Sequence, residues 1–162
     1  MLLSFRFANH RSFRDEQHLN LTPVYPGDLE GSEPRGAVSV AGIFGANASG
    51  KSNSLHALAM MKSLVLGSDR EVEPDVFKFR RFPFRLDVAS EDEPSRYVVD
   101  MRVGTSRYSY GFTVNSKCVL EEWLFEWPAN TNRKNLIYER VGQKFEWGDR
   151  TKRMLTSLKL LI

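Results

Sequence analysis

The chain begins with an alternation of apolar and polar positions. Leu3, Phe5 and Phe7 are apolar, and the residues between them are polar or small. This period of two is typical of a half-buried β-strand. Leu19 and Leu21 repeat the alternation after a polar turn. The pattern therefore predicts an N-terminal β-hairpin.

The next apolar segment is continuous rather than alternating. A loop rich in Pro, Gly and acidic residues covers residues 22–36, and residues 37–44 follow as Ala-Val-Ser-Val-Ala-Gly-Ile-Phe. A short continuous apolar run is typical of a strand buried on both faces. We therefore predict a buried strand over residues 37–44 that leads directly into the glycine-rich segment 45–52.

A helix is predicted immediately after the glycine-rich segment. From Lys51 onward, apolar residues recur at spacings of three and four, which is one stripe of an α-helix. The residues of this stripe are Leu55, Leu58, Met61 and Val65. Gly67 can end the helix, because glycine is favoured just past a helix C-terminus.

The second half of the chain consists of strand-like segments joined by short turns. These segments are residues 83–88, 96–103, 107–114, 117–127, 135–140 and 143–147. The connections are too short for crossover helices, so the pattern predicts an antiparallel meander. Residues 152–162 begin an amphipathic helix that the sequence does not complete, which indicates a fragment. We therefore divide the chain into residues 1–70, a meander over 71–150 and a helix start over 151–162.

Composition and charge narrow the class of protein. The chain has 162 residues, of which 41% are hydrophobic and 27% charged, as in an ordinary soluble domain. It contains no apolar run of about 18 residues, so we expect a cytoplasmic protein with no membrane partner. The single cysteine, Cys118, cannot form an internal disulfide and is expected to pack in a strand.

A mild basic excess leaves contact with nucleic acid open. The formal charge is +3, and residues 78–85 alternate cations with aromatic side chains. Such a stretch is either a surface for single-stranded nucleic acid or a half-buried segment whose arginines are solvated. No other feature of the sequence favours the first interpretation.

The glycine-rich segment has the spacing of a phosphate-binding loop. Its residues are Gly45, Ala46, Asn47, Ala48, Ser49, Gly50, Lys51 and Ser52. The glycines allow backbone N–H groups to turn toward an anion, and the helix N-terminus adds a positive end. Lys51 would reach the β- and γ-phosphates of ATP, and the Ser52 hydroxyl would ligate Mg²⁺. The alternative, a turn without a ligand, leaves the cation at the helix N-terminus unexplained.

The same residues resemble a known family. Residues 7–13 (Phe-Ala-Asn-His-Arg-Ser-Phe) and 44–58 are similar to the start of ABC-type ATPase heads of the RecF, chromosome-maintenance and DNA-break-repair branch. Residues 83–87, 108–112 and 120–124 resemble bacterial AAA-15 type ATPases, which are abortive-infection-like and related to overcoming-lysogenization-defect nucleases. The resemblance implies an α/β P-loop NTPase fold, in the form of an ABC-ATPase-like N-terminal lobe with an antiparallel β-meander subdomain.

The resemblance also nominates further contacts to the nucleotide. Arg11 matches a family arginine near the bound nucleotide; the alternative is an exposed charge in the hairpin turn. Asn47 matches the family's phosphate-loop asparagine; its alternative is a plain turn residue. Asn53, directly after Ser52, completes the set of candidate contacts.

Several parts of a complete ABC head are missing from the sequence. It shows no signature motif and no apolar run ending in Asp-Glu, so no catalytic carboxylate is identified. Gln143 lies among strand residues, and the three histidines, His10, His18 and His56, come too early for a switch histidine. We expect that this chain binds ATP without efficient turnover.

Three functions remain open at this stage. In the first, the intact protein is a homodimer around two ATP molecules that acts on DNA or a nuclease effector, with phage defence as one setting. In the second, the chain is a stand-alone nucleotide-sensing interaction module. A GTPase or small kinase is least favoured, because no Asn-Lys-x-Asp motif is present.

Overall fold

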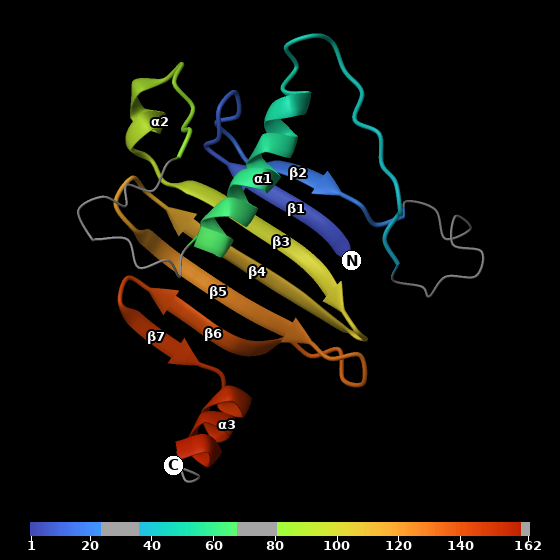
Figure 1. The fold of residues 1–162 in the computed structure, drawn as a ribbon, viewed down its shortest axis with the longest axis vertical. Helices are drawn as coiled ribbons and strands as arrows, with labels where there is room; N and C mark the ends of the chain where they lie inside the picture. Colours follow the sequence, from blue (N-terminus) through green and yellow to red (C-terminus); the bar gives the residue numbers. More distant parts are fainter. Residues whose placement is uncertain (24–35, 68–80, 160–162) are drawn as a thin grey trace.

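A computed structural model describes residues 1–23, 36–67 and 81–159 of the chain (Figure 1). Its strands form one antiparallel sheet of seven strands in the order β2-β1-β3-β4-β5-β6-β7. The strands are β1 (Leu2–Ala8), β2 (Gln17–Asn20), β3 (Ser95–Val103), β4 (Ser106–Val114), β5 (Val119–Trp127), β6 (Asn135–Val141) and β7 (Lys144–Trp147). The helices are α1 (Lys51–Gly67), α2 (Val88–Asp92) and α3 (Asp149–Lys159).

The predicted hairpin and the predicted meander are both confirmed. β1 and β2 pair antiparallel with Phe5 opposite Leu19. β1 also pairs antiparallel with β3, where Phe5 lies opposite Val99. From β3 to β7, each strand pairs with the next one along the chain. The hairpin and the meander therefore belong to the same sheet.

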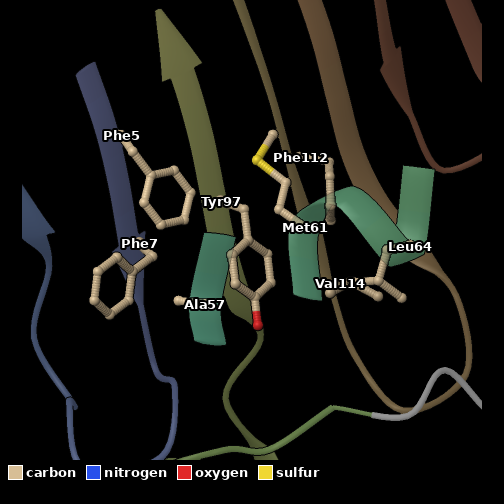
Figure 2. Close-up of a cluster of buried hydrophobic side chains, with 8 residues drawn as sticks. All are labelled: Phe5, Phe7, Ala57, Met61, Leu64, Tyr97, Phe112 and Val114. Atoms are coloured by element: carbon tan, nitrogen blue, oxygen red, sulfur yellow. The ribbon is translucent and has the colours of Figure 1, made fainter. Parts of the chain in front are cut away.

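The hydrophobic core lies between one face of the sheet and α1. The period of two places Phe5, Phe7, Tyr97 and Phe112 on this face, where each side chain is at most 3% exposed. Figure 2 shows Ala57, Met61 and Leu64 from α1 among the side chains of this cluster. Truncating one of these core phenylalanines to alanine typically costs about 3–5 kcal/mol, so this contact fixes α1 on the sheet.

The bounds of α1 agree with the prediction, and the predicted apolar stripe is only partly right: Met61 is buried and Leu58 packs against the core, whereas Leu55 and Val65 are exposed. The buried residues are Ala57, Met61 and Leu64. Leu55 is 57% exposed and Val65 is 39% exposed. The reason is that α1 carries apolar residues on two sides, so a spacing of three and four fits either side. A helix that is apolar on two sides is typical of one packed between two layers.

The predicted buried strand at residues 37–44 is wrong. The backbone N–H of Val38 donates to the Leu21 carbonyl at 2.8 Å, and the chain then runs without strand pairing to the glycine-rich loop. Val40 is 87% exposed and Phe44 is 94% exposed. A buried strand needs paired edges and two covered faces. Within the described residues, this segment has neither.

The predicted strand at residues 83–88 is also wrong. Residues 81–85 are irregular, and the short helix α2 follows. The Asp87 side chain caps α2 by accepting a hydrogen bond from the Ala89 N–H at 3.1 Å. Pro83 cannot donate to a strand ladder, and aspartate is a preferred N-cap residue. These two local preferences explain why a helix start replaces the predicted strand.

Two further expectations need correction. Cys118 is exposed in the turn before β5 and does not pack in a strand. The Asn115 side chain holds this turn by accepting hydrogen bonds from the N–H groups of Lys117 and Cys118, both at 2.8 Å. The last helix, α3, begins at Asp149, slightly earlier than predicted.

Candidate functional site

The glycine-rich loop reaches the N-terminus of α1 through two unusual backbone positions. Ala48 has φ of 63° and Gly50 has φ of 94°. Residues in this left-handed region alternate with ordinary ones and turn successive N–H groups toward the same side, which is the geometry of an anion-binding nest. A Cβ on Gly45 would lie 2.8 Å from the Ser49 hydroxyl oxygen. The loop is therefore too tightly folded for a larger residue at Gly45 without a shift of Ser49.

Lys51 places its charge over this loop. Its Nζ donates to the carbonyl oxygens of Gly45 at 2.8 Å and Ala46 at 2.7 Å. These two bonds use two of the three ammonium donors and hold the cation at the loop. The first turn of α1 contains no acidic residue that would repel an anion. The loop, the helix N-terminus and Lys51 thus form one positive site, and ATP phosphates fit its charge and its donors.

The remaining loop residues lie on the exposed side of the site. Residues 41–49 and Ser52 are exposed. Ser52 is the second residue of α1, so its hydroxyl lies beside the loop, where it would ligate Mg²⁺ bound with ATP. The described residues contain no group of three or more His, Cys, Asp and Glu side chains that could hold a metal ion.

The turn of the N-terminal hairpin packs against the loop. A Cβ on Gly50 would lie 2.4 Å from Cζ of Phe13, so the Phe13 ring covers this glycine directly. The Asn53 amide donates to the Ser12 hydroxyl at 2.8 Å. These contacts tie the phosphate loop and the first turn of α1 to the turn between β1 and β2. Asn53 thus has a structural partner besides its candidate role toward the nucleotide.

Arg11 lies at this junction. Its Nη1 donates to Asn53 Oδ1 at 3.3 Å, and its guanidinium lies 5.1 Å from the centre of the Phe82 ring. Its backbone has φ of 51°, and its N–H donates to the Phe82 carbonyl at 2.6 Å. The side chain is exposed beside the first turn of α1. It is therefore within the site region, and its contact with ATP stays a proposal.

Two histidines form a hydrogen-bonded link that the sequence did not predict. His10 Nε2 lies 2.9 Å from His56 Nδ1, and His10 Nδ1 lies 2.8 Å from the Tyr97 hydroxyl. His10 is fully buried, and burial followed by the nearby His56 and Arg11 lowers its pKa to about 4. Burial followed by Arg11 also lowers the pKa of His56. The link thus connects α1 to β3 through neutral imidazoles.

Four acidic residues, Asp87, Asp100, Glu121 and Glu122, lie on or beside elements other than the phosphate loop and α1. Asp87 caps α2, and Asp100 accepts from the Ser4 hydroxyl at 2.7 Å. Glu122 accepts from the Tyr110 and Tyr138 hydroxyls at 2.9 and 2.8 Å. Glu121 is exposed on β5. The structure assigns none of these four carboxylates to the phosphate loop.

The basic stretch at residues 78–85 is only partly described, because residues 78–80 lie outside the described residues. Arg81 donates to the carbonyls of Glu91 and Glu93. The Phe84 N–H donates to Asn9 Oδ1 at 2.8 Å. The described part of this stretch therefore packs against the hairpin turn and α2.

Sequence comparison assigns the chain to a class of nucleotide-binding P-loop ATPase domains. Residues 40–147 match the family described as "AAA domain, putative AbiEii toxin, Type IV TA system". Since the match covers more than half of the chain, the chain belongs to this family. No curated protein shows significant sequence similarity to it. Within the described ranges, no helix is long and apolar enough to cross a membrane.

Proposed function

We propose that this chain is the ATP-binding N-terminal part of an ABC-like ATPase of the AAA-15 type. In the intact protein, it would couple ATP binding and hydrolysis to DNA handling or to a nuclease effector, with phage defence as the biological setting. The observation that carries the proposal is the position of Lys51, whose ammonium group lies at the glycine loop and the N-terminus of α1. Such a site is built for a polyphosphate.

Each residue type has a separate task in binding Mg-ATP. Backbone N–H groups of residues 45–51 would donate hydrogen bonds to phosphate oxygens, and Lys51 would neutralise charge on the β- and γ-phosphates. The hydroxyl of Ser52 would ligate Mg²⁺, which draws charge from the phosphates when bound. Arg11 would add a second cation from the hairpin turn. The Phe13 ring, which lies where a Cβ on Gly50 would be, would hold the loop in its binding conformation.

The second apolar side of α1 supports the lobe architecture. Leu55, Leu58, Val65 and Leu66 line an apolar groove of about 600 Å³ together with residues of β3 and β4. A helix between two layers needs a second layer on this side. In an ABC-like head, a further lobe would supply this layer. That lobe and a second subunit of the homodimer would supply the groups that complete the ATP site. This feature favours the ATPase over the stand-alone sensing module.

A titration tests the nucleotide site. We expect isothermal calorimetry to show Mg-ATP binding to the chain and loss of this binding in Lys51→Ala. Lys62→Ala is the matched control, because Lys62 is an exposed lysine farther along the same helix. Equal affinity in the wild type and Lys51→Ala would contradict the proposed site.

A further inference from the structure

The face of the sheet opposite α1 carries a row of aromatic and cationic side chains. Along β5, Trp123, Phe125 and Trp127 alternate with Leu124 and Glu126, and Leu124 pairs with the core-facing Tyr110. The period of two therefore places the three aromatic residues on the opposite face. These three side chains are half-buried, so part of each ring is exposed.

Each aromatic ring has a cation over it. The Arg96 guanidinium lies 5.2 Å from the Trp123 ring centre, and the Arg107 guanidinium lies 4.2 Å from that of Trp127. Lys134 Nζ lies 3.6 Å from the Phe125 ring centre. Arg96, Arg107 and Lys134 are exposed. Together with their neighbours, these residues line an open groove of about 560 Å³.

Gly111 makes this surface flat. A Cβ on Gly111 would lie 2.4 Å from Cζ2 and 2.7 Å from Cε2 of Trp123, so the indole ring lies directly on the backbone of β4. A side chain at this position would lift the ring from the sheet. Because Gly111 has no side chain, the Trp123 ring lies against the sheet instead of projecting from it.

The charges on this face are not uniform. Asp100 accepts a hydrogen bond from Ser4 and pairs with Arg6 at 3.5 Å, so its charge is balanced locally. Glu121 and Glu139 also line the groove. Glu139 pairs in register with Trp123, whereas Arg107 pairs with Trp127. The end of the face at Phe125 and Trp127 is therefore the cationic end.

We propose that this cationic end, formed by Phe125, Trp127, Arg107 and Lys134, binds single-stranded nucleic acid. Arginine and lysine attract the phosphates, and a base can stack on an aromatic ring, whatever its sequence, once the cation over that ring has turned to a phosphate. An antiparallel sheet that presents aromatic residues is a known type of surface for stacking two or three unpaired bases. A duplex hides its base faces and cannot use this platform. This face would be the surface through which the protein handles nucleic acid. Only the biological role of the binding rests on the proposed function.

The test is a titration of the chain, without ATP, against a labelled 20-nucleotide oligo-dT followed by fluorescence anisotropy. We expect saturable binding that weakens as salt rises. Lys134→Glu and Trp127→Ala should each weaken binding at least fivefold. Lys62→Glu is the control for Lys134→Glu, because Lys62 is an exposed lysine on α1. Phe145→Ala is the control for Trp127→Ala, because Phe145 of β7 contacts Arg140 on the other face of the sheet. Both controls should stay within twofold of the wild type.

Three outcomes would overturn the proposal: no binding of oligo-dT at low salt, wild-type affinity in Lys134→Glu, or tighter binding to a duplex of the same length. Lys134→Glu leaves every aromatic residue in place, so it remains informative if Trp127→Ala fails to fold. A parallel titration with oligo-rU shows whether RNA or DNA is preferred. Mg-ATP affinity of Lys134→Glu should equal that of the wild type, which separates failure of this face from failure of the phosphate site.

Discussion

His10 Nε2 and His56 Nδ1 lie 2.9 Å apart, so a hydrogen bond links the turn between β1 and β2 to α1. His56 lies on α1 shortly after Lys51 and Ser52. His10 is in turn bonded to Tyr97 of β3. One imidazole must donate and the other accept, because two protonated rings would present only donors to each other. The link therefore requires at least one of the two histidines to stay neutral.

We predict that the protein loses stability as pH falls from about 6.5 toward 4. His10 has a folded-state pKa of about 4 against an ordinary value of 6.5. In this window the unfolded chain binds more protons than the folded chain, so the free energy of unfolding falls as pH falls. The loss attributable to His10 is at most about 3 kcal/mol, from the pKa difference.

Thermal unfolding across this pH range measures the effect. His10→Gln should show a shallower dependence of the free energy of unfolding on pH than the wild type. His18→Gln is the control, because His18 is exposed on β2. An unchanged dependence in His10→Gln would show that other groups control acid stability.

Arg11→Ala should weaken Mg-ATP binding about fivefold, equivalent to about 1 kcal/mol, because it removes an exposed cation beside the first turn of α1. The bond from Arg11 to Asn53 is 3.3 Å long and exposed, so the thermal stability should change little. Calorimetry of the variant gives the affinity. Arg14→Ala is the matched control from the same turn, where Arg14 pairs with Asp15 at 3.2 Å. Comparable losses in both variants would mean that only the general charge of the turn matters.

Gly50→Ala should lower the affinity for Mg-ATP more than tenfold and destabilise the fold by about 1–3 kcal/mol. The variant combines a positive φ of 94° with a Cβ placed 2.4 Å from Phe13. Gly104→Ala is the control, since Gly104 has φ of 57° but no atom within 4 Å of the added Cβ. It should lose stability through backbone strain alone and bind ATP normally. Normal affinity in Gly50→Ala would show that the loop tolerates displacement of Phe13.

The elements that follow from local patterns could be predicted from the sequence. Alternation in β1 and β4 and the bounds of α1 are local properties, and the structure agrees with them. Whether residues 37–44 form a buried strand could not be judged from the local pattern, because burial of a strand depends on what lies beside it. The stripe on α1 was only partly right for a related reason: two apolar sides satisfy the same spacing, and only packing in the core cluster buries Ala57 and Leu64 rather than Leu55 and Val65.

In the candidate site, too, features set by local sequence were predicted and features set by packing were not. The spacing of Gly45, Gly50 and Lys51 predicts a phosphate-binding loop from local sequence alone, and the structure places Lys51 Nζ at the carbonyls of Gly45 and Ala46. The histidine link was missed, because His10 and His56 are far apart in the sequence and meet only through packing. The aromatic face was missed for the same reason. The sequence drew attention to residues 78–85. The cation–ring pairs of the open face instead join β5 to β3, to β4 and to the segment before β6.

Our last prediction is that this chain alone releases phosphate from ATP no faster than background, although it binds ATP. Hydrolysis at a phosphate loop needs a carboxylate that positions water and further charge stabilisation beyond the lysine. The four candidate carboxylates are Asp87, Asp100, Glu121 and Glu122, and each lies on an element other than the loop and α1. Phosphate release at saturating Mg-ATP, with Lys51→Ala as the control for contaminating enzymes, measures this. Turnover of about one per second, an ordinary enzyme rate, that disappears in Lys51→Ala would mean that the chain supplies its own catalytic carboxylate.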